Sequence, residues 1–112
     1  SPAYYYSLRL EGPESTWWYK GGITNNDVEK RILNIISSLK RNNLPLEVTI
    51  EGSVLFGLGK DAKSLEEELL DIIDIREETL EKFEGSRELF NIDPLSYARE
   101  NNLLDYDLLL DE

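Results

Sequence analysis

The sequence predicts one α+β domain, in which helices pack on an antiparallel sheet of about three strands in the order β-β-α-β-α-α. Two observations lead to this prediction. The beginning of the chain alternates apolar and polar residues with a period of two, and the segments that follow place apolar residues at helical spacing. A length of 112 residues lies near the most common domain size and is enough for one modest core.

The first two strands are expected to form a hairpin. Residues 4–10 alternate so that Tyr4 and Tyr6 lie on one face of a strand and Tyr5 lies on the other. A Gly-Pro step then marks a turn of more than two residues. The aromatic and β-branched run 16–24 follows and is predicted to be the second strand.

A helix is expected after the hairpin, because Asn26 and Glu29 have the spacing of a capping box. An Asn-Asn-x-Pro segment ends this helix. Residues 46–51 are predicted to be a third strand, extended past a bulge or bend at Gly52. The apolar stripe of the helix consists of Val28, Ile32, Ile35, Ile36 and Leu39.

A second helix is expected to open at a capping box formed by Ser64 and Glu67. The apolar positions that follow fit one long helix or two shorter ones, with a natural stop at Gly85. Asp93–Pro94 begins a last short helix, since proline is favoured at the first helical position. The tail 103–112 shows no clear period.

Composition excludes several kinds of function. The chain has no cysteine and no histidine, so disulfides, thiolate zinc sites and Ser-His-Asp or Cys-His catalysis are impossible. No apolar run approaches membrane-spanning length, and the first residues lack a signal-peptide pattern. We therefore expect a soluble cytoplasmic protein that is not associated with a membrane.

The charge is distributed unevenly. The net charge of −11 opposes binding to nucleic acid. Residues 1–60, however, carry seven Lys and Arg against six Asp and Glu, a net charge of +1, whereas residues 61–112 carry five against seventeen, a net charge of −12. A phosphate-handling site in the first half therefore remains electrostatically possible.

Four segments in the same order resemble the GIY-YIG nuclease superfamily. The "YYY" triplet 4–6 takes the place of GIY, and "YKGGITNNDVEKRI" at 19–32 resembles the YIG strand, its turn and the helix that bears an arginine. The match is closest to the bacterial and phage branch that has lysine at the YIG tyrosine. "DAKSLEEELL" at 61–70 resembles the A-x-x-L-E helix of that branch, and "GSRELF" at 85–90 resembles its G-x-x-E-W-F segment. The resemblance covers residues 4–93.

The resemblance implies a metal-dependent endonuclease with four catalytic residues. Tyr6 and Lys20 would activate the attacking water, and each would do so best beside another cation. Arg31 would hold the phosphate, because its planar fork matches phosphate oxygens. Glu88 would bind Mg²⁺ or Mn²⁺, since hard divalent cations prefer carboxylate and phosphate oxygens.

Three further residues are candidates for substrate binding. Gly22 either permits close approach of a phosphate backbone or simply supplies a turn. Tyr4 lies on the same face as Tyr6 and is the alternative tyrosine for the site. Trp18, with its neighbour Trp17, could stack on unpaired bases; the other interpretation is that one indole belongs to the core and one to the surface.

These observations divide the chain into a nuclease-like domain at 1–93 and a C-terminal helix with an acidic tail at 94–112. The expected substrate is nucleic acid, DNA in the first place. Two alternatives are a non-catalytic interaction module that binds a protein partner through the acidic residues 61–112, and a DNA-mimicking inhibitor. The nuclease interpretation requires the candidate catalytic side chains to converge on one cleft.

Overall fold

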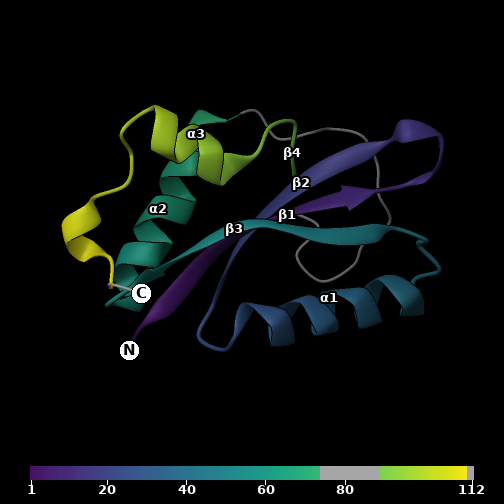
Figure 1. Cartoon of the computed structure of the whole chain (residues 1–112), viewed down its shortest axis with the longest axis horizontal. Helices are drawn as coiled ribbons and strands as arrows, with labels where there is room; N and C mark the ends of the chain where they lie inside the picture. The colour runs from purple at the N-terminus through teal and green to yellow at the C-terminus, as the bar shows by residue number, and fades with distance from the viewer. Residues whose placement is uncertain (74–88, 111–112) are drawn as a thin grey trace.

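The computed structural model describes residues 1–73 and 89–110. Within these ranges four strands form one antiparallel sheet with the order β3-β1-β2-β4 (Figure 1). The strands are β1 Ala3–Glu11, β2 Trp17–Thr24, β3 Glu47–Phe56 and β4 Leu89–Phe90. The helices are α1 Val28–Arg41, α2 Gly59–Ile72 and α3 Pro94–Glu100, with short 3₁₀ turns at Pro13–Ser15 and Tyr106–Leu108. The predicted α+β class is confirmed, and the sheet has one more short strand than expected.

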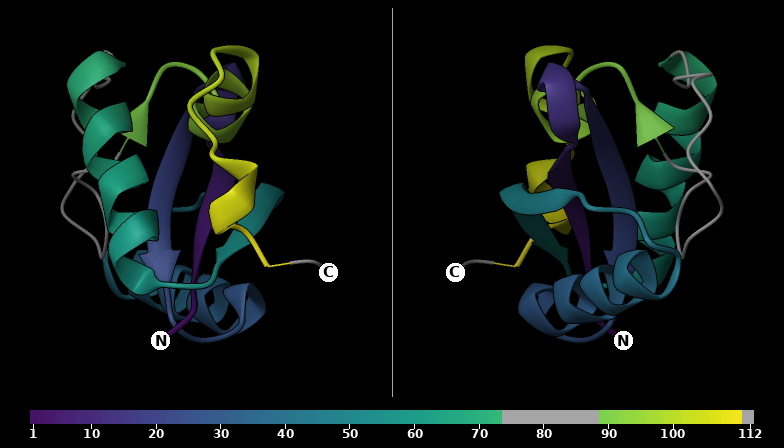
Figure 2. Two further views of the ribbon diagram at one scale, coloured as in Figure 1. Left: turned by 90° about the vertical axis from the view of Figure 1, so that its left-hand side faces the viewer. Right: turned by 90° about the vertical axis from the view of Figure 1, so that its right-hand side faces the viewer.

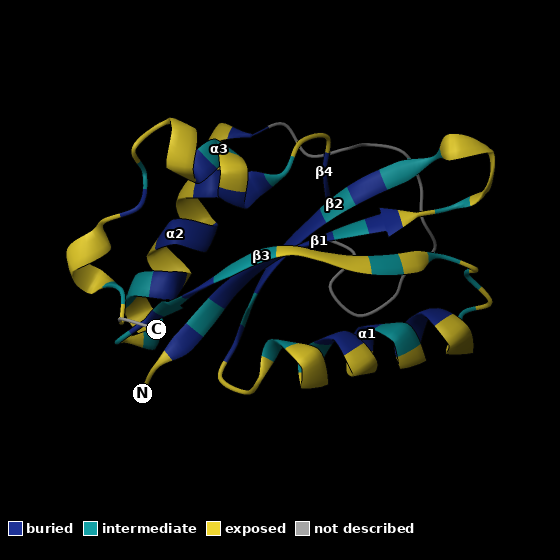
Figure 3. Ribbon diagram, viewed as in Figure 1, coloured by how far each residue is buried: buried dark blue, intermediate teal, exposed yellow. Residues whose placement is uncertain are grey.

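Helices cover both faces of the sheet. Helix α1 packs on one face, and α2 and α3 pack on the other (Figures 1 and 2). The alternation of β1 produces this arrangement, because Tyr6, Leu8 and Leu10 face α1 while Ala3 and Tyr5 face α2. Burial therefore concentrates where the strands meet the helices (Figure 3). Besides these β1 residues, the core on the α1 side contains Trp18, Ile32, Ile35, Leu39 and Leu89.

In the hairpin, large side chains of β1 pack over glycines of β2. Tyr6 lies opposite Gly22 in the register of β1 and β2. A Cβ atom at Gly22 would collide with the phenol of Tyr6, and one at Gly21 would collide with the hydroxyl of Tyr5. The Tyr6 ring thus covers Gly22 on one face of the sheet, and the Tyr5 ring covers Gly21 on the other face. Glycine is needed here because the rings occupy the space that a side chain would fill.

Both predicted capping boxes are wrong. Helix α1 begins at Val28 with Asp27 as its N-cap residue, one position after Asn26. Helix α2 begins at Gly59, so Ser64 lies inside the helix, where its hydroxyl donates to the carbonyl of Lys60. The start of α2 is set instead by a tertiary contact, in which the Gly59 N–H donates to the carbonyl oxygen of Ser1 at 2.8 Å.

Two further predictions concern the bulge in the third strand and the end of the second helix. The expected bulge in β3 is confirmed, because Gly52 pairs with Ser7 while Ile50 pairs with Leu8 and one β3 residue between them has no partner in the register. Helix α2 ends at Ile72 and Ile73 is extended, so the alternative of one long helix is wrong; the predicted stop at Gly85 lies outside the described residues.

The last helix and the tail close the core on the α2 side. Asp93 caps α3 as expected, since its carboxylate accepts hydrogen bonds from the Leu95 and Ser96 N–H groups. The same carboxylate accepts the Ser7 hydroxyl at 2.7 Å, which ties α3 to β1. Leu104 is buried in the same core as the apolar residues of α2, so residues after 93 belong to this core.

None of the helices in the described part of the chain is long and apolar enough to cross a membrane.

Candidate active site

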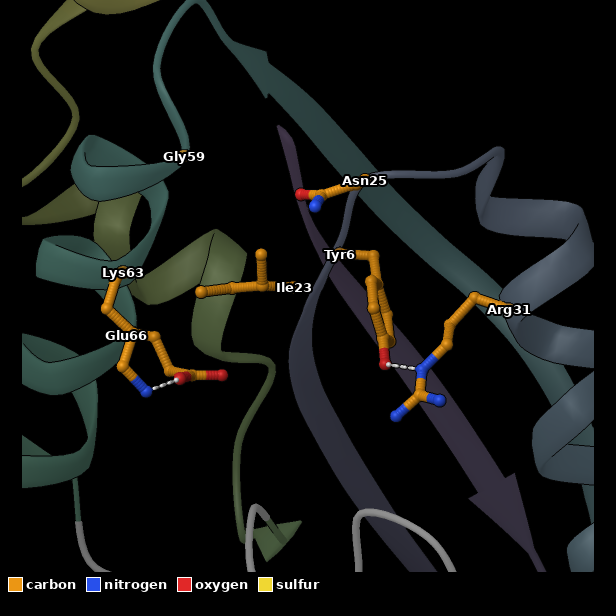
Figure 4. Close-up of a pocket in the computed structure, with 7 residues that line it drawn as sticks. All are labelled: Tyr6, Ile23, Asn25, Arg31, Gly59, Lys63 and Glu66. Carbon is orange, nitrogen blue, oxygen red and sulfur yellow. Dashed lines mark hydrogen bonds and ion pairs between the residues drawn. The ribbon is translucent and has the colours of Figure 1, made fainter. Parts of the chain in front are cut away.

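A pocket of about 440 Å³ opens beside the end of β2, between α1 and α2 (Figure 4). Strand β4 pairs with β2 only at Tyr19 and Lys20. Among the described residues, the next part of β2 is therefore an edge, and side chains from the helices on the two faces reach it. The pocket is lined by Tyr6, Ile23, Asn25, Arg31, Gly59, Lys63 and Glu66.

Tyr6 and Arg31 form one wall of the pocket. The Tyr6 side chain is fully buried, and its hydroxyl oxygen accepts a hydrogen bond from Nε of Arg31 at 3.2 Å. Arg31 lies next to Ile32, which is buried, so the packing of α1 directs the guanidinium toward the sheet edge. The guanidinium itself points into the pocket (Figure 4). A phosphate that enters would meet a charged planar donor fixed by a tyrosine.

Lys20 lies behind this wall. It is fully buried, and its register position opposite Leu8 places it on the same face as Tyr6. Its ammonium lies 5.4 Å from the centre of the Tyr6 ring and donates to the carbonyl of Gly21 at 3.1 Å. Two cations, Lys20 and Arg31, therefore flank one phenol. This arrangement suits negative charge that develops beside the hydroxyl.

Glu66 and Lys63 form the facing wall, on α2. The Glu66 side chain is only 8% exposed, and its Oε1 lies 3.0 Å from the ammonium of Lys63, whose side chain is 60% exposed. Both side chains lie across the pocket from Tyr6 and Arg31 (Figure 4). Sequence reasoning did not select Glu66, although it is the final residue of the A-x-x-L-E pattern. Beyond that resemblance, no sequence pattern sets it apart from the other acidic residues of this segment; the structure does, because Glu66 is buried beside Ala62 and Leu65.

The structure brings three of the four predicted catalytic residues together: Tyr6, Lys20 and Arg31. The fourth, Glu88, lies outside the described residues. The three predicted substrate-binding residues are placed as follows: Gly22 lies beneath the Tyr6 ring, Tyr4 lines a separate cavity of about 270 Å³ with Asp27 and Ser53, and Trp18 is 6% exposed in the core against α1.

The described residues of the pocket offer few ligands for a metal ion. The described residues hold no group of three or more acidic, histidine or cysteine side chains that could enclose an ion. They provide the carboxylate of Glu66 and, at the rim, the amide of Asn25. Magnesium keeps several waters and is commonly held by one or two carboxylates together with substrate phosphate oxygens. Asn25 lies well away from Glu66 (Figure 4), so an ion at Glu66 would need waters and phosphate oxygens as its other ligands.

The comparisons with known proteins do not identify a family. No protein-family profile, no curated protein and no solved structure matches it. A function must therefore be argued from the geometry of the pocket and from the motif resemblance.

Proposed function

We propose that this protein is a metal-dependent endonuclease of the GIY-YIG type, which hydrolyses phosphodiester bonds in nucleic acid, with DNA as the favoured substrate. The observation that supports this proposal most is the convergence of Tyr6, Lys20 and Arg31 beside one pocket, with the carboxylate of Glu66 on the facing wall. These residues come from β1, β2, α1 and α2, so the tertiary fold is needed to assemble them.

The residues of the pocket have different roles in the proposed reaction. Arg31 holds the scissile phosphate and stabilises the charge that builds on its oxygens. Tyr6 orients the attacking water, with the Lys20 ammonium behind its ring, and the water gives its proton to solvent as the new phosphorus–oxygen bond forms. The bond from phosphorus to the sugar oxygen on the opposite side then breaks, and that oxygen takes a proton from solvent.

Glu66 is the residue that we assign to metal binding. Its carboxylate lies in the pocket wall among buried residues of α2. Bound Mg²⁺ or Mn²⁺ would supply Lewis-acid stabilisation of the leaving oxygen. Glu88 remains a second candidate ligand from the motif resemblance.

The local charge favours a phosphate despite the acidity of the chain. Among the residues at 1–73 and 89–110, the side chains of Lys20, Arg31 and Lys63 bring three positive charges to the pocket and its back wall, and Glu66 is the one acidic residue that lines it. The many other acidic residues at 61–112 still repel a polyanion. We therefore expect weak binding of nucleic acid that depends strongly on salt.

The test is cleavage by the purified chain. A supercoiled plasmid and labelled single- and double-stranded oligonucleotides are incubated with Mg²⁺, with Mn²⁺ or with EDTA. The proposal predicts cleavage that requires metal, that is lost in Glu66→Gln and that persists in Glu67→Gln, a change at an exposed neighbour on the same helix. If the parent protein cleaves none of these substrates with either metal, the nuclease proposal fails and the non-catalytic interaction module is favoured.

A further inference from the structure

We propose that Lys63 couples metal binding to nucleic-acid binding by exchanging partners. In the metal-free protein its ammonium neutralises Glu66; when a divalent cation binds Glu66, the ammonium moves to a phosphate of the nucleic acid. This inference rests on the proposed function, because it requires Glu66 to be the metal ligand.

The first argument is the unequal mobility of the two side chains. Glu66 is almost fully buried, whereas most of the Lys63 side chain lies in water. The lysine stem is long and flexible, and an ion pair whose cation remains largely hydrated contributes little to stability. The carboxylate is therefore the fixed member of the pair, and the ammonium is the member that moves more easily.

The second argument is that Lys63 and a metal ion compete for the same place. The ammonium lies 3.0 Å from Oε1 of Glu66, so a divalent cation on either oxygen of this carboxylate would lie close to it. A magnesium ion needs an oxygen at about 2.0–2.1 Å, and it would repel an ammonium that stayed beside it. A buried carboxylate without any cation is also costly. Glu66 therefore needs one cation, and a divalent ion bound to it would weaken the hold on Lys63 by charge repulsion.

The third argument concerns the place to which the ammonium moves. Lys63 lines the same pocket as Arg31, which stands on the opposite wall (Figure 4). A phosphate that is held by Arg31 and reaches toward the metal would pass within range of the released ammonium. Metal binding thus brings the two positive charges of the ion and the single charge of Lys63 to the phosphate site, and the two ligands bind with positive cooperativity.

This arrangement predicts effects of opposite sign for Lys63→Gln. Without nucleic acid the variant should bind Mn²⁺ more tightly than the parent, by about 3- to 10-fold, because the competing ammonium is gone. With metal present it should bind nucleic acid more weakly. A lysine that only contacted phosphate would change the second affinity alone, and a lysine with only a structural role would change neither.

The experiment measures binding without turnover. Calorimetric titration of the full chain with Mn²⁺ alone compares the parent with Lys63→Gln and with Lys60→Gln, a control at an exposed lysine on the same helix. Fluorescence anisotropy of a labelled DNA duplex, in Ca²⁺ or in EDTA, then gives the effect of a divalent cation on DNA affinity for each protein. We expect Ca²⁺ to strengthen DNA binding in the parent and in Lys60→Gln, and to do so much less in Lys63→Gln.

A third variant separates the failure of this inference from the failure of the proposed function. If Glu66→Gln keeps the parental Mn²⁺ affinity, Glu66 is not the ligand and the proposed metal site is wrong. If Glu66→Gln loses this binding but Lys63→Gln binds Mn²⁺ no more tightly than the parent, the metal site stands and the exchange by Lys63 is refuted.

Discussion

Replacing Tyr6 with phenylalanine removes a single oxygen atom from the centre of the proposed site. The ring remains, so the space above Gly22 stays filled. The change deletes the acceptor of the 3.2 Å hydrogen bond from Arg31. A bond to a charged donor contributes about 1.5–3 kcal/mol when it is well buried. Because Arg31 is partly exposed and can bind water instead, we expect a loss of about 1 kcal/mol in the free energy of unfolding.

The effect on activity should be much larger than the effect on stability. Without the hydroxyl, Arg31 loses its anchor and the attacking water loses its orienting group, so kcat should fall by about 10²-fold or more. Plasmid nicking in Mg²⁺ measures the activity, and urea unfolding followed by tryptophan fluorescence measures the stability.

Tyr5→Phe is a closely matched control. Tyr5 is adjacent in the chain and equally buried, but its ring lies on the opposite face of the sheet, over Gly21. It should retain nearly parental activity, with a change in stability of similar size to that of Tyr6→Phe. Equal losses of activity in the two variants, or full activity in Tyr6→Phe, would refute the assignment of Tyr6 to the site.

Three further predictions concern packing, capping and charge. Gly22→Ala should lower the free energy of unfolding by about 1–3 kcal/mol through overpacking, and it should reduce nicking because the new Cβ atom displaces Tyr6. Gly52→Ala should lower it less in the same urea titration, because the nearest atom is the end of the Leu95 side chain at 3.1 Å. Asp93→Ala should lose about 1 kcal/mol by uncapping α3 while leaving kcat unchanged; a drop in kcat without loss of stability would place Asp93 in the reaction. DNA affinity should fall steeply between about 50 and 200 mM salt, and an affinity that survives this increase would indicate a different kind of ligand.

The features of the fold that follow a simple period could be predicted from the sequence. Alternation in β1 fixed the faces of Tyr5 and Tyr6, and helical spacing predicted the buried stripe of α1, in which Ile35 and Leu39 are buried. The helix starts could not be predicted from capping patterns. In α2 the start depends on Ser1, a residue distant in sequence, and no local pattern encodes that contact.

The candidate site could be predicted where the strand period of β1 or the helical period of α1 determines which way a side chain faces. Arg31 beside the α1 stripe and Tyr6 on the facing side of β1 follow from spacing alone. The approach of Lys20 to Tyr6 requires the register of the hairpin, which a long loop leaves undetermined. Glu66 was missed because the second half of the chain contains many acidic residues, and only tertiary burial distinguishes this one from its exposed neighbours.

The most direct test of the account is the rate of Mg²⁺-dependent plasmid nicking by Arg31→Ala and Arg41→Ala, measured beside the parent protein. The two arginines lie on the same helix, but Arg41 is exposed at its last residue, far from the pocket. The account predicts that Arg31→Ala lowers the rate by about 10²-fold or more, as for the loss of a preorganised charge donor, while Arg41→Ala stays close to the parent. Equal rates for the two variants, or a parent protein that does not nick DNA, would contradict it.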